Sequence, residues 1–379
     1  MPIAIQKTLS LLLMILLGYL LRSKLNQDEH RKGMKVVILD LALPAMIFVA
    51  LMGVQLESDL LLLPLMVLCW NGIMLATSYF VLPWMGIERL SPQHRTWMML
   101  FPSLAPGLSC FPFLIEYLGE EALAWGALAD VGNKVYVLLL AYMIAMAWYY
   151  RVQKIGGQSS SSKIKELLLA MVKEPINMVL IVAIVLLSLG LNMDSLPGFL
   201  GETILMMKNI MTPLVLLFIG MSVILKWKQI QSIFSLLLFR AGVSLMISGF
   251  ILYFFELPSS AAALVLVVFP LSSASFWPFA HMSSVHQLEY QKESTNHTFD
   301  LGLGINILAV SLPFSTLLIL GIFSAGEVFV AAKPVVLLGL GLFVLPLIPK
   351  MVVWAKNLDF DFSLPKNPTY KDSTSQERG

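Results

Sequence analysis

The sequence has little charge. Only 13% of its 379 residues are Asp, Glu, Lys or Arg, whereas 58% are hydrophobic, and the mean hydropathy is +0.82. A soluble domain carries about 25% charged residues. The composition therefore excludes a large soluble core and predicts a polytopic protein of the lipid bilayer. The net charge of +2 offers no basic surface for a nucleic acid, so we expect no nucleic-acid partner.

Chemical motifs are also scarce. The two cysteines, Cys69 and Cys110, both lie in apolar stretches, which leaves neither a disulfide framework nor a cysteine metal set. The chain has no Gly-x-x-x-x-Gly-Lys-Ser/Thr loop for a nucleotide and no His-Glu-x-x-His motif. We find no histidine deep in a predicted span. These absences argue against an enzyme, against a cofactor and against transport powered by a nucleotide.

Three of the five histidines lie close together in the sequence. His281, His286 and His297 fall near Glu289 and Glu293 in what we expect to be a cytoplasmic connection. A metal site is conceivable there, but the irregular spacing favours a solvated loop. We therefore predict no metal site.

Apolar stretches of about 20 residues predict membrane helices. Eleven such stretches are present: 3–21, 34–53, 60–84, 97–117, 122–150, 175–192, 203–225, 230–255, 258–280, 299–322 and 328–349. The polar linker 151–174 contains GGQSSSSK, a composition typical of flexible connections. The predicted organisation is a five-helix repeat at 1–150, the linker at 151–174, a second five-helix repeat at 175–322, an extra helix at 323–355 and a disordered tail at 356–379.

Basic residues predict the orientation. Lys and Arg occur in alternate connections, whereas the intervening connections carry Asp and Glu and no Lys or Arg. The basic side faces the cytoplasm, so the N-terminus is predicted outside and the C-terminus inside, as an odd number of spans requires. Five helices before the linker make the second set enter from the opposite side, which predicts inverted repeats. LPAMIFVALMG (43–53) and TPLVLLFIGMS (212–222) are matching segments of the two halves.

Two spans in corresponding places are interrupted by proline. Residues 100–118 contain Pro102, Pro106 and Pro112, and residues 267–282 contain Pro270 and Pro278. Irregular backbone at membrane depth persists only where protein or a wet cavity surrounds it, and paired interruptions indicate the central site of a transporter. Two ordinary kinked helices are the alternative. The predicted crossover residues are Pro106, Gly107, Ser109, Pro270, Ser272 and Ser273.

Polar residues inside spans are functional candidates because each is costly there. Asp130 and Lys134 are four residues apart on one helix face and can form an ion pair, with a structural role and a site role equally open. Arg240 lies about 15 Å deep, where it either binds a carboxylate or bridges to Asp130 or to a helix C-terminus. We expect Lys208 to reach the interface rather than pair with Asp40. Asparagines that can bond across helices are Asn71, Asn133 and Asn306.

Several segments resemble the auxin efflux carrier family, which includes plant PIN-type carriers and bacterial permeases. These are LGYLLRSKLNQDEHRKGMKVVILDLALPAMIFVAL (17–51), PSLAPGLSCFPFLIEYLGEEALAWGALADVGNKVYVLLL (102–140), EPINMVLIVAIVLLSLGL (174–191), FPLSSASFWPFAHM (269–282) and DLGLGINILAVSLPF (300–314).

The resemblance implies inverted five-helix repeats whose fourth and ninth helices cross at prolines, here Pro106 and Pro270. It also implies a scaffold of helices one, two, six and seven, a moving unit of the other six, an organic-anion substrate and a homodimer. The family's asparagine in the first crossover is absent here.

We therefore expect an all-α secondary transporter that moves a small carboxylate by elevator-type alternating access, with protons as a candidate coupling ion. Asp130, Asn133, Lys134, Arg240 and Asn306 would line or brace the crossover. The alternative, which the missing asparagine keeps open, is a sensor on the same fold that binds a ligand without transporting it.

Overall fold

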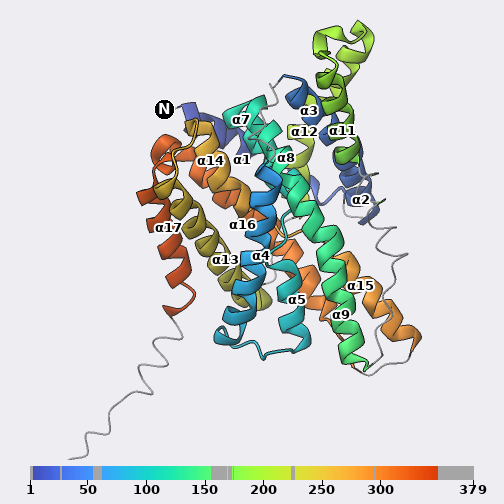
Figure 1. Cartoon of the computed structure of the whole chain (residues 1–379), viewed down its shortest axis with the longest axis vertical. Coiled ribbons are helices and arrows are strands. Elements are labelled where there is room, and N and C mark those ends of the chain that lie inside the picture. The colour runs from blue at the N-terminus through green and yellow to red at the C-terminus, as the bar shows by residue number, and fades with distance from the viewer. Residues whose placement is uncertain are drawn as a thin grey trace, which may run out of the picture.

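The computed structural model describes residues 3–25, 28–53, 62–154, 169, 173, 175–222, 227–292 and 296–348 (Figure 1). Most of the predicted linker, Glu293 and the whole predicted tail lie outside these residues. Within the described part of the chain every regular element is a helix and no strand occurs. The prediction of an all-α polytopic membrane protein is confirmed.

The first half contains α1 (Ile3–Leu21), α2 (Asp28–Val36), the π-helix η1 (Val37–Ala42), α3 (Leu43–Met52), α4 (Leu62–Trp84), α5 (Pro92–Leu100), α6 (Pro106–Ser109), α7 (Phe111–Leu118), α8 (Glu120–Lys134), the π-helix η3 (Val135–Leu140) and α9 (Ala141–Val152). The second half contains α11 (Pro175–Ser188), η4 (Met193–Ser195), α12 (Gly198–Ser222), α13 (Trp227–Phe254), α14 (Ser260–Val268), η5 (Phe269–Leu271), α15 (Phe276–Gln291), α16 (Leu301–Ser324), η6 (Gly326–Val330) and α17 (Ala332–Val344).

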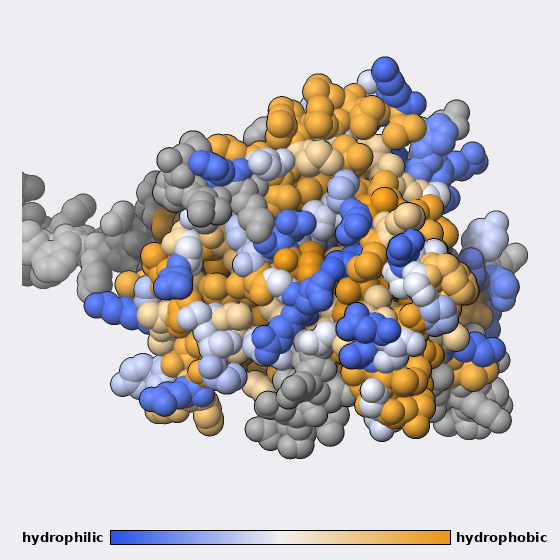
Figure 2. Space-filling view, turned by 90° about the horizontal axis from the view of Figure 1, so that it is seen from above, coloured by the Kyte–Doolittle hydropathy of each residue, from blue (hydrophilic) through white to orange (hydrophobic). Residues whose placement is uncertain are grey.

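Seven of the described helical segments are long and apolar enough to cross a membrane, and three more are apolar but shorter. The remaining predicted span is the segment 97–117, which the structure divides among α5, α6 and α7. Large apolar side chains such as Phe80, Trp84 and Met206 are exposed, as expected where lipid replaces water. Figure 2 shows hydrophilic residues across the middle of one face, with hydrophobic residues around them.

Small residues bring the helices into close contact. A Cβ on Gly18 of α1 would lie 2.3 Å from the carbonyl oxygen of Leu217, and one on Gly220 of α12 would lie 2.0 Å from that of Ile15. Glycine at both positions therefore lets the backbones of α1 and α12 touch, which is how helices associate in lipid. Gly242 of α13 is similarly close to Gly339 of α17, and Figure 1 shows α17 beside α13 at the edge of the molecule.

Candidate functional site

The first crossover is an irregular segment, residues 101–105, between α5 and α6. Pro102 and Pro106 cannot donate backbone hydrogen bonds, so α5 cannot continue through them. A second break follows at Cys110, whose φ and ψ of −127° and −49° separate α6 from α7. Pro112 lies within the first turn of α7, where proline is tolerated. Of the three prolines in the predicted span, Pro102 and Pro106 therefore belong to the first break, between α5 and α6.

The second crossover is the serine-rich segment 272–275 between η5 and α15. Ser272 (φ −54°, ψ 150°) and Ser275 (φ −81°, ψ 145°) both leave the helical region. The hydroxyl of Ser275 accepts a weak hydrogen bond from the backbone N–H of Trp277 at 3.4 Å and so caps α15. The backbone is thus extended where the sequence predicted an interruption.

The two crossovers hydrogen-bond directly to each other. The N–H of Ala105 donates to the carbonyl of Ser273 at 2.8 Å. The N–H of Ser273 donates to the hydroxyl of Ser109 at 2.9 Å, and that of Ser275 donates to the hydroxyl of Ser103 at 3.0 Å. All these serines are buried. Backbone groups released by the broken helices therefore find partners on the opposite crossover, as the apolar surroundings require.

Arg240 of α13 joins both crossovers to the rest of the protein. Its Nε donates to the carbonyl of Phe101 at 2.8 Å, and its two terminal nitrogens donate to those of Ser103 and Ser272 at 2.9 Å each. The side chain is buried. Among the alternatives predicted for Arg240, these bonds correspond to the bridge to helix C-termini, because the accepting carbonyls follow the last turns of α5 and η5. These contacts give Arg240 a bracing role.

Asn133 completes the support of the first crossover. Its side-chain oxygen accepts from the N–H of Leu104 at 3.1 Å, and its amide donates to the Leu104 carbonyl and to Asp130 at 2.9 and 2.8 Å. Asn71 of α4 donates to the Pro102 carbonyl at 2.6 Å. Both asparagines thus bond between elements, as predicted for them.

Asp130 and Lys134 form the predicted ion pair at 3.6 Å, and both are buried. Lys134 also donates to Asn177 of α11 at 3.3 Å. The pair therefore lies where α8, which carries it, approaches α11.

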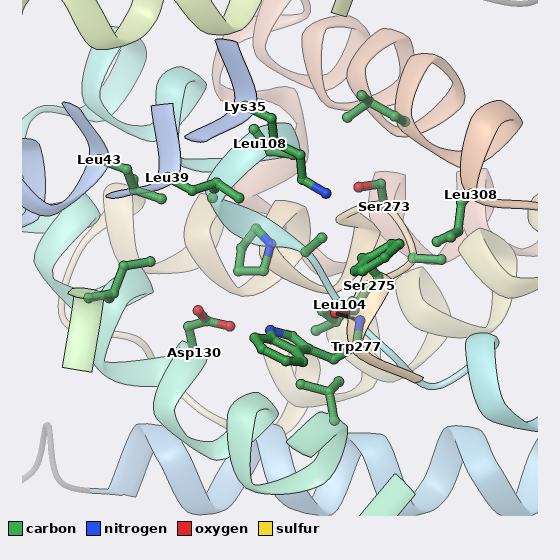
Figure 3. A pocket seen from close by; sticks show the side chains of 18 of the residues that line it. Lys35, Leu39, Leu43, Leu104, Leu108, Asp130, Ser273, Ser275, Trp277 and Leu308 are labelled. Carbon is green, nitrogen blue, oxygen red and sulfur yellow. Dashed lines mark hydrogen bonds between the residues drawn. The ribbon is translucent and has the colours of Figure 1, made fainter. Parts of the chain in front are cut away.

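A cavity of about 710 Å³ lies against the two crossovers. In Figure 3 the amine of Lys35 and the carboxylate of Asp130 point into it from opposite sides, with Ser273, Ser275 and Trp277 on a third. The ammonium of Lys35 lies 4.5 Å from the centre of the Phe276 ring. Four basic and two acidic side chains line this cavity: Arg31, Lys32, Lys35 and Lys134, and Asp40 and Asp130.

A second cavity, of about 1200 Å³, is lined by acidic residues instead. Glu120, Glu121 and Glu256 line it, and Pro270 forms part of its wall. Leu104 of the first crossover lines both cavities. Leu104 therefore lies between a cavity with basic residues and a cavity with acidic ones.

The structure distributes the predicted site residues over several places. The first cavity is lined by Pro106, Gly107, Asp130, Asn133, Lys134 and Ser273. Pro270 lines the second cavity. Neither cavity is lined by the other four predicted residues, Ser109, Ser272, Arg240 and Asn306. The two serines and the arginine belong to the hydrogen-bond network of the crossovers, and Asn306 is half-buried on α16.

Sequence reasoning did not single out Lys35, Asp40 or Trp277 as site residues. Lys35 and Asp40 both lie near the start of the predicted span 34–53. The π-helix η1 contains Asp40, and the π-helix η3 contributes Val137 to the cavity wall. π-Helical turns are often found at functional sites, but no local sequence pattern indicates them.

Lys208 forms an ion pair with Glu120, which is far away in the sequence and lies between two predicted spans. One expectation about polar residues is wrong. His281 and Glu289 do not belong to a solvated loop, because α15 continues to Gln291 and both side chains are buried. His281 bonds to the carbonyl of Val137 at 2.9 Å.

Comparison with known proteins gives limited information. No protein-family model matches the chain. A 236-residue stretch, 60% of the chain, is 23% identical to an uncharacterized transporter of Methanocaldococcus jannaschii and covers 73% of that protein. The chain is therefore a multi-pass membrane protein that is similar to a transporter.

Proposed function

We propose that the protein is a secondary transporter for a small organic anion and that the substrate binds in the cavity beside the two crossovers. The observation that carries this proposal is the charge of the cavity wall, which has four basic and two acidic side chains. Because Lys134 is paired with Asp130, Lys35 is the best candidate to meet a carboxylate. Among the described residues Lys35 takes part in no ion pair.

The crossovers add a second attraction for an anion. The N-terminus of α15 lies at the cavity through Phe276 and Trp277. A helix N-terminus carries partial positive charge and N–H groups. A carboxylate in the cavity would therefore meet both a lysine ammonium and a helix dipole.

The walls of the cavity support an elevator mechanism. One side is formed by α2, η1, α3, α11 and α12, and the other by the crossovers, α8, η3, α15 and α16. These are the two groups that the resemblance to the auxin efflux carrier family implies as a fixed scaffold and a moving unit. Movement of the second group would carry the crossovers between the cavity with basic residues and the cavity with acidic residues. In this proposal the N-terminus lies outside and the C-terminus lies in the cytoplasm.

The test is uptake of a panel of labelled small carboxylates into proteoliposomes, with and without a proton gradient. Wild-type protein should show saturable uptake of at least one of them. We expect Lys35→Ala to raise KM or abolish uptake while the protein stays folded. Lys24→Ala is the matched control, because Lys24 is an exposed lysine that follows α1 and does not line the cavity.

Binding without flux would favour the alternative, a sensor on the same fold. Uptake with equal KM in Lys35→Ala and Lys24→Ala would contradict the assignment of Lys35. Protons are the proposed coupling ion, with Asp130 as the carrier. Uptake that keeps the wild-type pH dependence in Asp130→Asn would remove Asp130 from that role. A homodimer is part of the proposal, and the mass of the detergent-solubilised protein tests it.

A further inference from the structure

The end of α15 carries a cluster of three side chains that the transport site does not use. The potential ligand atoms of His286, Glu289 and His297 all lie within 4.8 Å of one another. Glu289 Oε2 is 3.6 Å from Nδ1 of His297 and 3.9 Å from Nδ1 of His286. The two imidazole rings are 5.4 Å apart, centre to centre.

Buried atoms in the cluster lack hydrogen-bond partners. Glu289 is 1% exposed, and its Oε2 has no hydrogen-bond partner; the same is true of the buried Nδ1 of His286. A buried polar atom without a partner costs on the order of 1–3 kcal/mol, and more when it carries charge. The two atoms lie 3.9 Å apart, so a single ion between them would satisfy both.

The surrounding residues hold the carboxylate in one orientation. Glu289 Oε1 accepts from the N–H of Thr298 at 2.9 Å, from the Thr298 hydroxyl and from the amide of Gln153 at 3.4 Å. Oε1 is therefore fully engaged, and Oε2 is left facing the imidazoles. Hydrogen bonds that orient a ligand in this way are typical around bound metals.

A buried cation beside the cluster, Arg95, does not take the place of a metal. Arg95 donates to the backbone carbonyls of Leu90, His297 and Thr298. It thereby fixes the backbone that carries His297, and none of these bonds involves Glu289 Oε2. Lys292 lies over the ring of Tyr149 at 5.7 Å.

We propose that His286, Glu289 and His297 bind a Zn²⁺ ion. Two imidazoles and one carboxylate form a donor set that zinc accepts, with a water molecule in a fourth position. Tetrahedral ligands at 2.0–2.1 Å from zinc are roughly 3.4 Å apart, so the distances of 3.6 and 3.9 Å to Glu289 Oε2 need only a small closure. His286 and His297 are 43% and 55% exposed, which gives the ion access from water.

The zinc would join two parts of the chain. His286 and Glu289 are on the last turns of α15, whereas His297 precedes Thr298 and Asp300, and Asp300 caps α16. Gln153, which follows α9, bonds to Glu289 and to the Asn296 carbonyl. The ion would therefore fix the connection between α15 and α16 against the end of α9. This role does not depend on the proposed transport activity.

The experiment measures Zn²⁺ affinity of the purified full-length chain after chelator treatment, in competition with a chromophoric zinc indicator. Wild-type protein should bind one Zn²⁺ per chain. The double variant His286→Ala/His297→Ala should bind at least about a hundredfold more weakly, since even changes outside the ligand set cost 10–100-fold. The two side chains are 43% and 55% exposed, so this variant should fold.

Two further variants test the assignment. His30→Ala removes an exposed histidine of α2 far from the cluster in sequence and should leave zinc affinity unchanged. Glu289→Gln keeps an oxygen that can accept from Thr298 but loses the charge, so it should weaken zinc binding without unfolding the protein. Co²⁺ should show the strong ligand-field absorption of a four-coordinate ion in wild type and lose it in the double variant.

Equal zinc affinity in wild type and the double variant would overturn the proposal, as would the absence of a stoichiometric site in wild type. Loss of zinc binding in His30→Ala would show that the zinc site lies elsewhere and would also overturn the proposal.

Discussion

The two crossovers differ in which side chains bind the backbone groups that the helix breaks release. In the first crossover the released backbone groups are bound mainly by amide and guanidinium side chains from other helices: Asn71 of α4, Asn133 of α8 and Arg240 of α13. In the second, most partners are serines: Ser103 of the first crossover, Ser109 of α6 and Ser311 of α16.

This difference teaches how to interpret polar residues inside the bilayer. Polar side chains next to interrupted helices were candidates for substrate contacts, yet most of their hydrogen-bonding groups bind the backbone. Proline removes donors and leaves carbonyls without partners, and in an apolar medium each such group must be satisfied. Among the charged residues that line the cavity, Lys35 is the one that we propose to meet a ligand.

The largest effect should come from the residue that both crossovers share. Arg240→Ala leaves three buried carbonyls without donors, and we expect a destabilisation of roughly 3–5 kcal/mol, seen as loss of the monodisperse peak in size-exclusion chromatography or a large fall in Tm. Arg240→Lys, which keeps the charge and fewer donors, should be intermediate. A stable Arg240→Ala protein that has lost uptake would instead make Arg240 a substrate ligand.

A smaller effect should follow when the first crossover alone loses support. Asn133→Ala leaves both the N–H and the carbonyl of Leu104 without their partner, and we expect a loss of about 1–3 kcal/mol. Thermal unfolding in detergent measures it. Asn209→Ala is the control, because it removes an exposed asparagine of α12, and a comparable loss of stability there would contradict the importance given to Asn133.

The smallest effect should come from a single bond between the crossovers. Ser109→Ala removes the acceptor of the Ser273 N–H and should cost about 0.5–1.5 kcal/mol. The same Tm assay detects it. Ser109 and Ser103 each bind one N–H of the second crossover, so a double variant with Ser103→Ala should show a coupling energy. Strict additivity of the two single changes would indicate that the crossovers do not act as one unit.

Much of the fold could be predicted from the sequence because lipid imposes simple rules. The lengths of the apolar stretches predicted the membrane spans. Pro102 and Pro270 indicated where α5 and α14 end. The i, i+4 spacing of Asp130 and Lys134 fixed their pairing. Each of these depends on residues close in the sequence, or on the bilayer itself. The inverted relation of the two halves remains a prediction.

The rest depended on contacts between distant segments. Lys208 pairs with Glu120, which is 88 positions away in the sequence, and Arg240 donates to the carbonyl of Phe101, which is 139 positions away. Nothing in the local sequence decides which of several buried polar groups a long side chain will reach, since packing of whole helices brings them together. The sequence by itself determined an all-helical membrane protein with two interrupted spans. Only the tertiary structure decided that Arg240 braces the crossovers, that Lys35 faces the cavity, and that Glu289 is buried between two histidines.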